Sequence, residues 1–231
     1  MATGSSLISK ILSPALRLWL RSQVQGVESL QVDIQGQDRQ ILKGYVPRVS
    51  LSAEQAVYQG LRLGRALLRG ENIRINIGQV IKGKPLQLLE PIQVAGEVRL
   101  SEEDLQASLA SELLQNALGE LLTALLEQEG ANLRSYPVRW QSVTLGERTF
   151  HLGGTFLDLE NTPQSLRLQG VLSLLNSKTL RLEQVKIQGL PHLAELPVDQ
   201  LTVDLGEDVE IETLSLTGRE LSCLGRLLIR P

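Results

Sequence analysis

One segment of the chain comes close to a nucleotide-binding motif. Residues 78–85 have the sequence Gly-Gln-Val-Ile-Lys-Gly-Lys-Pro, which matches the phosphate-binding loop G-x-x-x-x-G-K up to its last position. That position needs a Ser or Thr hydroxyl to hold Mg²⁺, and Pro85 has none. We therefore interpret the segment as a basic turn, in which Lys82 and Lys84 could contact a phosphate group of another kind.

Other residues with catalytic or metal-binding chemistry are few. His151 and His192 are the only histidines, and neither belongs to an H-E-x-x-H pair; the chain also has no G-x-S-x-G elbow. The acidic residues between Glu195 and Glu212 lack the spacing and central glycine of a Ca²⁺ loop. We therefore predict that the protein is not an enzyme and has no catalytic residue, metal site or cofactor.

The composition favours an unusually aliphatic interior. Hydrophobic residues make up 42% of the 231 residues, but aromatic residues make up only 3%, and leucine is the most abundant type. A leucine-rich interior is expected of a plain core and also of a cavity that holds acyl chains. Cys223 is the only cysteine, which excludes an intrachain disulfide and fits a reducing compartment.

The N-terminal residues predict an amphipathic helix from about Ser6 to Gln23, with Ser13 as a helix cap before Pro14. At about 100° per residue, its basic side chains share one stripe and Trp19 lies on the wide apolar side. This pattern is typical of a helix at a membrane interface, and equally of a surface helix packed on a sheet. The interfacial interpretation predicts membrane contacts by Lys10, Arg17, Trp19 and Arg21.

The N-terminal segment does not predict a membrane span or a signal peptide. Lys10, Arg17 and Arg21 interrupt it, so it lacks the run of about 18 apolar residues that a spanning helix requires. No basic cluster precedes an apolar stretch, and no small-x-small cleavage pattern follows one. We therefore expect peripheral association with the cytoplasmic side of a membrane.

Most of the remaining chain predicts β-strands, because apolar and polar residues alternate. The phase slips between Leu180/Leu182 and Val185/Ile187, and a slip of one residue predicts a bulge that bends the sheet. We predict half-buried strands where apolar residues alternate with polar ones: Leu30/Val32/Ile34, Ile73/Ile75/Ile77, Ile92/Val94/Val98/Leu100, Leu166/Leu168 and Val209/Ile211.

A central helical segment is predicted over about residues 101–129. Ser101 is placed to cap a first helix, a second helix is expected to start near Ser111, and Gly130 is expected to end it. We therefore divide the chain into an N-terminal helix (1–25) and a single domain (26–231). The second helix has a leucine side that we predict to line an acyl-chain groove: Leu114, Leu118, Leu121 and Leu125.

Six short stretches of the sequence resemble the bacterial LmeA-like phospholipid-binding family, and together they sample most of the chain. They are residues 10–16 (Lys-Ile-Leu-Ser-Pro-Ala-Leu), 42–53, 58–61, 71–76, 83–86 and 100–105. The resemblance implies an α+β fold like that of tubular lipid-binding (TULIP) domains, in which curved antiparallel sheets wrap long amphipathic helices. It also implies phospholipid binding without catalysis, and it assigns no individual binding residue.

Two functional hypotheses follow from these patterns. In the first, an apolar groove holds acyl chains at a membrane surface, and Lys82 and Lys84 contact the headgroup. In the second, the protein is a membrane-peripheral scaffold with a closed core and no lipid ligand. An enzyme acting on lipids would need a nucleophile and base around His151 or His192. Nucleic acid is not an expected partner, because the net charge is −3 and basic and aromatic residues do not interleave.

Overall fold

A computed structural model describes residues 11–128, 137–158, 160–190 and 193–231. In chain order the helices and strands are α1 (Ser13–Gln23), β1 (Ser29–Gln35), α2 (Asp38–Ile41), β2 (Tyr45–Tyr58), β3 (Leu61–Arg74), α3 (Ile77–Val80), β4 (Ile92–Ser101), α4 (Glu102–Ser108), α5 (Glu112–Gln128), β5 (Arg139–Leu145), β6 (Thr149–Leu157), β7 (Pro163–Asn176), β8 (Thr179–Leu190), β9 (Leu193–Asp204), β10 (Val209–Thr217) and β11 (Glu220–Ile229).

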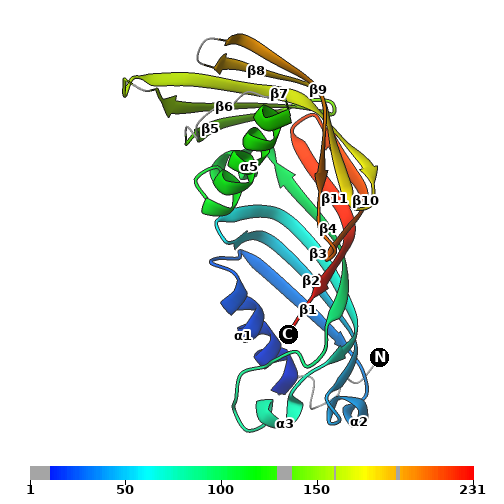
Figure 1. The fold of residues 1–231 in the computed structure, drawn as a ribbon. Coiled ribbons are helices and arrows are strands. Elements are labelled where there is room, and N and C mark those ends of the chain that lie inside the picture. Colours follow the sequence, from blue (N-terminus) through cyan, green and yellow to red (C-terminus); the bar gives the residue numbers. More distant parts are fainter. Residues whose placement is uncertain (1–10, 129–136, 159, 191–192) are drawn as a thin grey trace.

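The strands form two antiparallel sheets that curve strongly (Figure 1). The first has the order β1-β2-β3-β4-β11-β10, and the second has the order β5-β6-β7-β8-β9. Backbone hydrogen bonds join the two sheets at Arg148, which lies between β5 and β6. Its N–H donates to the Leu216 carbonyl of β10 (3.2 Å), and its carbonyl accepts from the Leu172 N–H of β7 (2.9 Å). The prediction of curved antiparallel sheets in a β-rich α+β protein is confirmed.

The bulge predicted in β8 is present. Along the β7–β8 pair, the register changes from Gln169↔Lys186 to Val171↔Glu183, so β8 contains one residue more than its partner. Gln184 lies at this point with a φ of 51°. An extra residue of this kind increases the local twist of a strand, which is consistent with the curvature of the second sheet.

The predicted starts of the central helices are also confirmed. The Ser101 hydroxyl accepts from the Asp104 N–H (3.0 Å), and the Asp104 carboxylate accepts from the Ser101 N–H (2.9 Å), which together form a capping box. The second helix, α5, begins at Glu112. Gly130, the predicted end, lies outside the described residues.

Two local predictions are wrong. The strand expected to run through Ile77 ends at Arg74, because Asn76 turns the chain and its side chain bonds to residues beyond α3; Ile75 makes only an isolated bridge to Leu88. Ser13 does not cap α1, because the preceding residue, Leu12, already has right-handed helical angles and takes the cap position.

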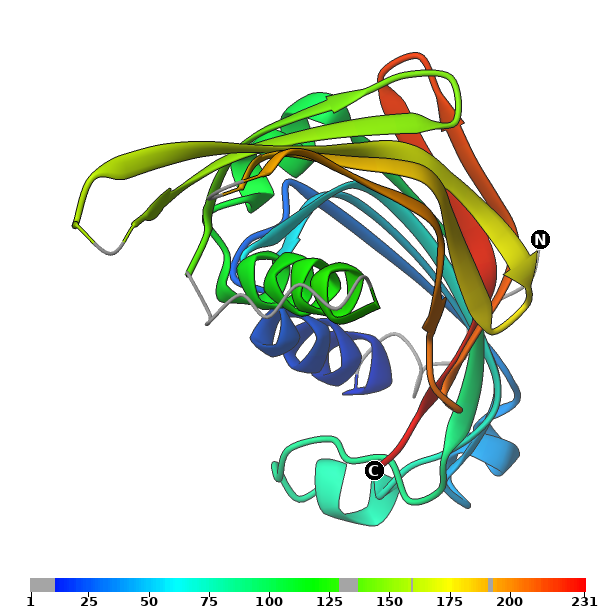
Figure 2. The same ribbon diagram turned by 45° about the horizontal axis from the view of Figure 1, so that its top comes forward.

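The core is divided between the two sheets. One apolar cluster joins α5 to the second sheet, and another joins α1, α2 and α3 to the first sheet. Both longer helices, α1 and α5, lie on the concave side of the curved sheets (Figure 2). Side chains of these two helices and of the sheets therefore meet on the concave side.

Candidate functional site

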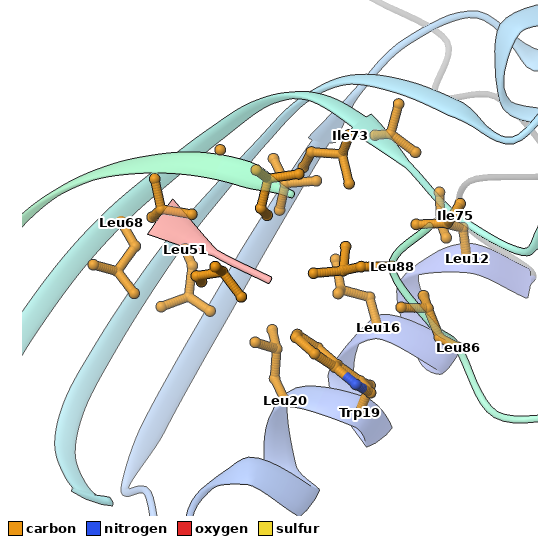
Figure 3. A pocket seen from close by; sticks show the side chains of 16 residues that line it. Leu12, Leu16, Trp19, Leu20, Leu51, Leu68, Ile73, Ile75, Leu86 and Leu88 are labelled. Carbon is orange, nitrogen blue, oxygen red and sulfur yellow. The ribbon is translucent and has the colours of Figure 1, made fainter. Parts of the chain in front are cut away.

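An apolar cavity of about 110 Å³ lies between α1 and the first sheet (Figure 3). Its walls come from α1, from β2, β3 and β4, from the connection after α3, and from the end of β11. The lining residues are Leu12, Leu16, Trp19, Leu20, Val46, Val49, Leu51, Leu68, Gly70, Ile73, Ile75, Leu86, Leu88, Ile92, Val94 and Ile229. Among these side chains, only the indole of Trp19 carries a polar atom, so the cavity suits a hydrocarbon group and not a polar one.

The helix α1 covers one side of the cavity with its apolar side. Leu12, Leu16 and Leu20 recur every four residues and therefore face the sheet together with Trp19. Leu12 is only 1% exposed. Of the two interpretations of this segment, packing on a sheet is the one found for residues 11–23.

The residues predicted to contact a membrane do not lie together. Trp19 is half-buried in the cavity wall, whereas Arg17 and Arg21 are exposed on the opposite side of α1. Lys10 lies outside the described residues. Membrane contact by the two arginines stays a prediction.

A connection held by one buried amide forms a further wall of the cavity. The Asn76 side chain accepts from the Gln87 N–H (2.8 Å) and donates to the Pro85 carbonyl (3.0 Å). These bonds fix the positions of Leu86 and Leu88, which line the cavity. Asn76 itself is only 8% exposed, so water does not replace these partners easily.

We expect Asn76→Ala to lower the free energy of unfolding by about 1–3 kcal/mol, because it removes two hydrogen bonds that a buried side chain makes to the backbone. Urea unfolding followed by circular dichroism measures the effect. Asn116→Ala, at an exposed position of α5, is the matched control and should change stability by less than about 0.5 kcal/mol. Equal stability of the two variants would show that the Asn76 bonds do not hold this wall.

The predicted headgroup contacts, Lys82 and Lys84, lie in an exposed turn after α3. Gly83 between them has a φ of +80°, a conformation that glycine adopts at little cost. The turn leads directly into Leu86 of the cavity wall. Lys82 and Lys84 therefore belong to the same connection as Leu86 and Leu88 of the cavity wall. Their contact with lipid stays a prediction.

The four leucines predicted to line an acyl groove lie in another part of the molecule. Leu125 is fully buried, and the other three are partly buried against the cluster that joins α5 to the second sheet. None of them lines the cavity beneath α1. The apolar alternation in β2, β3 and β4 carried a signal for the observed lining, but only the fold shows that it faces α1.

Cys223 lies on the concave face of the first sheet. It pairs with Val98 of β4 and has the same parity along β11 as Ile229, which lines the cavity, so both side chains point to one face. The thiol is half-buried, and burial raises its pKa. The reaction rate of this thiol therefore reports how easily a small reagent reaches the concave face.

We expect Cys223 to react with iodoacetamide at pH 8 more slowly than a cysteine in a short peptide. The raised pKa leaves less thiolate, which is the reactive form. Mass spectrometry of the alkylated protein gives the rate, and the same reaction in urea is the control, in which the peptide rate should return. A folded protein that reacts at the peptide rate would contradict the observed burial.

Groups for acid–base or metal chemistry are not gathered within the described part of the chain. His151 is exposed on β6, and His192 lies outside the described residues. No cluster of three or more potential metal ligands occurs in the ranges that the structure covers. Three acidic residues near the C-terminus instead make ion pairs: Asp208 with Arg230, Glu210 with Lys178 and Glu212 with Arg226.

Comparison with known proteins places the apolar cavity in context. None of the helices in the described ranges has the length and hydropathy needed to cross a membrane. No curated protein and no solved structure matches the chain significantly. A family model described as LmeA-like phospholipid-binding matches residues 3–226, which include every described element except the last residues of β11. A match of this extent, together with a lining made almost wholly of hydrocarbon, leads to one conclusion: the chain belongs to the LmeA-like phospholipid-binding family.

Proposed function

We propose that this protein binds a phospholipid without chemical conversion, and that part of an acyl chain occupies the cavity between α1 and the first sheet. The observation that carries the proposal is the cavity lining, which offers hydrocarbon contacts and no hydrogen-bonding partner except the Trp19 indole. An acyl chain gains about 25 cal/mol for each Å² that it buries. A headgroup would gain nothing there and would stay outside.

The size of the cavity limits how much of a chain it holds in the observed conformation. A dry protein cavity of about 150 Å³ accommodates one benzene molecule, and the observed cavity is about 110 Å³. A whole acyl chain therefore requires α1 to move outward from the sheet. Such a movement would exchange Leu12 and Leu16 for lipid methylene groups on the same apolar surface.

The small cavity also favours the alternative function, a membrane-peripheral scaffold that holds no lipid. In that case α1 would stay in place, and the remaining space would be an ordinary packing defect. The two proposals differ in one observable property, because only the carrier contains phospholipid in a defined stoichiometry.

The proposal also includes the type of fold, the division into domains and the place where the protein acts. Curved sheets around α1 and α5 support a TULIP-like arrangement, and we treat residues 26–231 as one lipid-binding domain that α1 covers in part. Peripheral action at a membrane, on its cytoplasmic side, fits the exposed cations Arg17 and Arg21.

Native mass spectrometry of gently purified protein tests the proposal. We expect one co-purified phospholipid per chain, and chloroform extraction followed by lipid analysis should recover the lipid intact. Protein that contains no lipid, and that acquires none from phosphatidylcholine vesicles with 30% phosphatidylglycerol, would instead support the scaffold.

A further inference from the structure

One end of the molecule combines exposed apolar side chains with lysines. Figure 1 places α2 and α3 at this end and the second sheet at the other. Leu42 follows α2, Ile81 follows α3, and Leu89 precedes β4; these three side chains are 47% to 58% exposed. We call the residues 38–44 and 78–90 the α2/α3 tip.

The three exposed side chains are held on one rigid base. Each directly follows a residue that packs in the apolar cluster joining α1, α2 and α3 to the first sheet: Ile41, Val80 and Leu88. A hydrogen bond from the Ile75 N–H to the Gly44 carbonyl (2.9 Å) ties the α2 turn to the chain that leads into α3. The exposure of these side chains is therefore a feature of ordered turns that share one apolar cluster.

The charge of the tip is complementary to an anionic surface. Lys43 follows Leu42, and Lys82 follows Ile81, with Lys84 in the same turn. Together with Arg39, these cations outnumber the acidic residues of the tip, Asp38 and Glu90. Alternating apolar and cationic side chains allow leucine and isoleucine to enter the acyl boundary while the ammonium groups stay among lipid phosphates.

We infer that the α2/α3 tip docks the protein on the surface of an anionic phospholipid bilayer. The inference rests on the proposed function and extends it, because it names the surface through which lipid is reached. The segment that carries Leu89 also supplies Leu86 and Leu88 to the cavity wall. Docking at the tip therefore places the bilayer beside the cavity, and an acyl chain can pass between α1 and this segment.

Flotation with vesicles of phosphatidylcholine and 30% phosphatidylglycerol tests the inference on the full chain. We expect Lys43→Gln/Lys82→Gln/Lys84→Gln to weaken binding by about tenfold or more, because each cation near an anionic leaflet contributes measurably to affinity. Leu42→Ser/Ile81→Ser/Leu89→Ser should weaken it to a similar extent. Vesicles of phosphatidylcholine alone should bind the unchanged protein only weakly.

Matched controls lie at the far end of the molecule. Leu157 and Leu175, in the second sheet, fall in the same range of exposure as the tip residues, and Leu157→Ser/Leu175→Ser should bind vesicles like the unchanged protein. Arg139→Gln/Arg167→Gln/Arg219→Gln removes as much positive charge elsewhere and should also retain binding. Tip variants that float as well as these controls would overturn the inference.

A fluorescence measurement keeps the test independent of mutant stability. In a Cys223→Ser background, an environment-sensitive dye on Ile81→Cys should shift to the blue when anionic vesicles are added, whereas the same dye on Leu157→Cys should not. No shift at position 81 would overturn tip docking. Failure of the proposed function looks different, because the unchanged protein would then contain no phospholipid, whatever the tip variants do.

Discussion

Replacing Leu68 by Trp is expected to lower the phospholipid content of folded protein about tenfold or more. Leu68 lies on β3, and its half-buried side chain lines the cavity opposite α1 (Figure 3). An indole at this position fills space that an acyl chain would otherwise occupy, and a close-packed interior does not expand without a cost of about 1–3 kcal/mol. Lipid per folded chain is measured by native mass spectrometry.

The neighbouring residue provides the control for this substitution. Leu67 is also half-buried on β3 but does not line the cavity, because successive side chains of a strand point to opposite faces. Leu67→Trp should therefore keep the normal phospholipid content. Equal lipid contents in the two variants, both high or both low, would mean that the cavity beneath α1 is not the binding site.

Replacing Leu125 by Ala is expected to destabilise the protein by about 3–4 kcal/mol. Leu125 is 0% exposed in the cluster that joins α5 to the second sheet, and truncation of a buried leucine leaves a cavity that the surroundings fill only in part. For a chain of this size, such a loss lowers the melting temperature by roughly 10 °C. Thermal unfolding followed by circular dichroism measures it.

The same helix offers a matched control. Leu113 is 41% exposed on α5, so Leu113→Ala should change stability by less than about 0.5 kcal/mol. The Leu125 variant should also keep its lipid at temperatures where it is folded, since Leu125 does not line the cavity beneath α1. Loss of lipid without loss of stability would instead support the acyl-chain groove that the sequence predicts on α5.

The features that the sequence predicts well depend on local interactions. The cap at Ser101 is formed by a residue three positions away, and the bulge at Gln184 is visible as a change of phase within one strand. The start of α5 follows from a break in its leucine stripe. Each of these signals is contained in a short stretch of chain.

The cavity itself depends on contacts between distant segments. Leu16, Leu68 and Ile229 line one space, although no pattern in the sequence relates α1 to β3 or to the end of β11. The incorrect strand at Ile77 has the same origin, because the bonds from Asn76 to Pro85 and Gln87 override the local alternation. Long-range packing of this kind decides which leucines meet a ligand.

The two tryptophans of the protein allow an acyl chain beneath α1 to be detected directly. Trp19 lines the cavity, whereas Trp140 is buried in the core of the second sheet. Protein is loaded with a phospholipid that carries a brominated acyl chain and is freed of vesicles by gel filtration. In Trp140→Phe, which retains Trp19, bromine should quench the fluorescence strongly; in Trp19→Phe, which retains Trp140, it should not. Unquenched Trp19 in protein that contains one bound phospholipid would show that the acyl chain does not lie beneath α1.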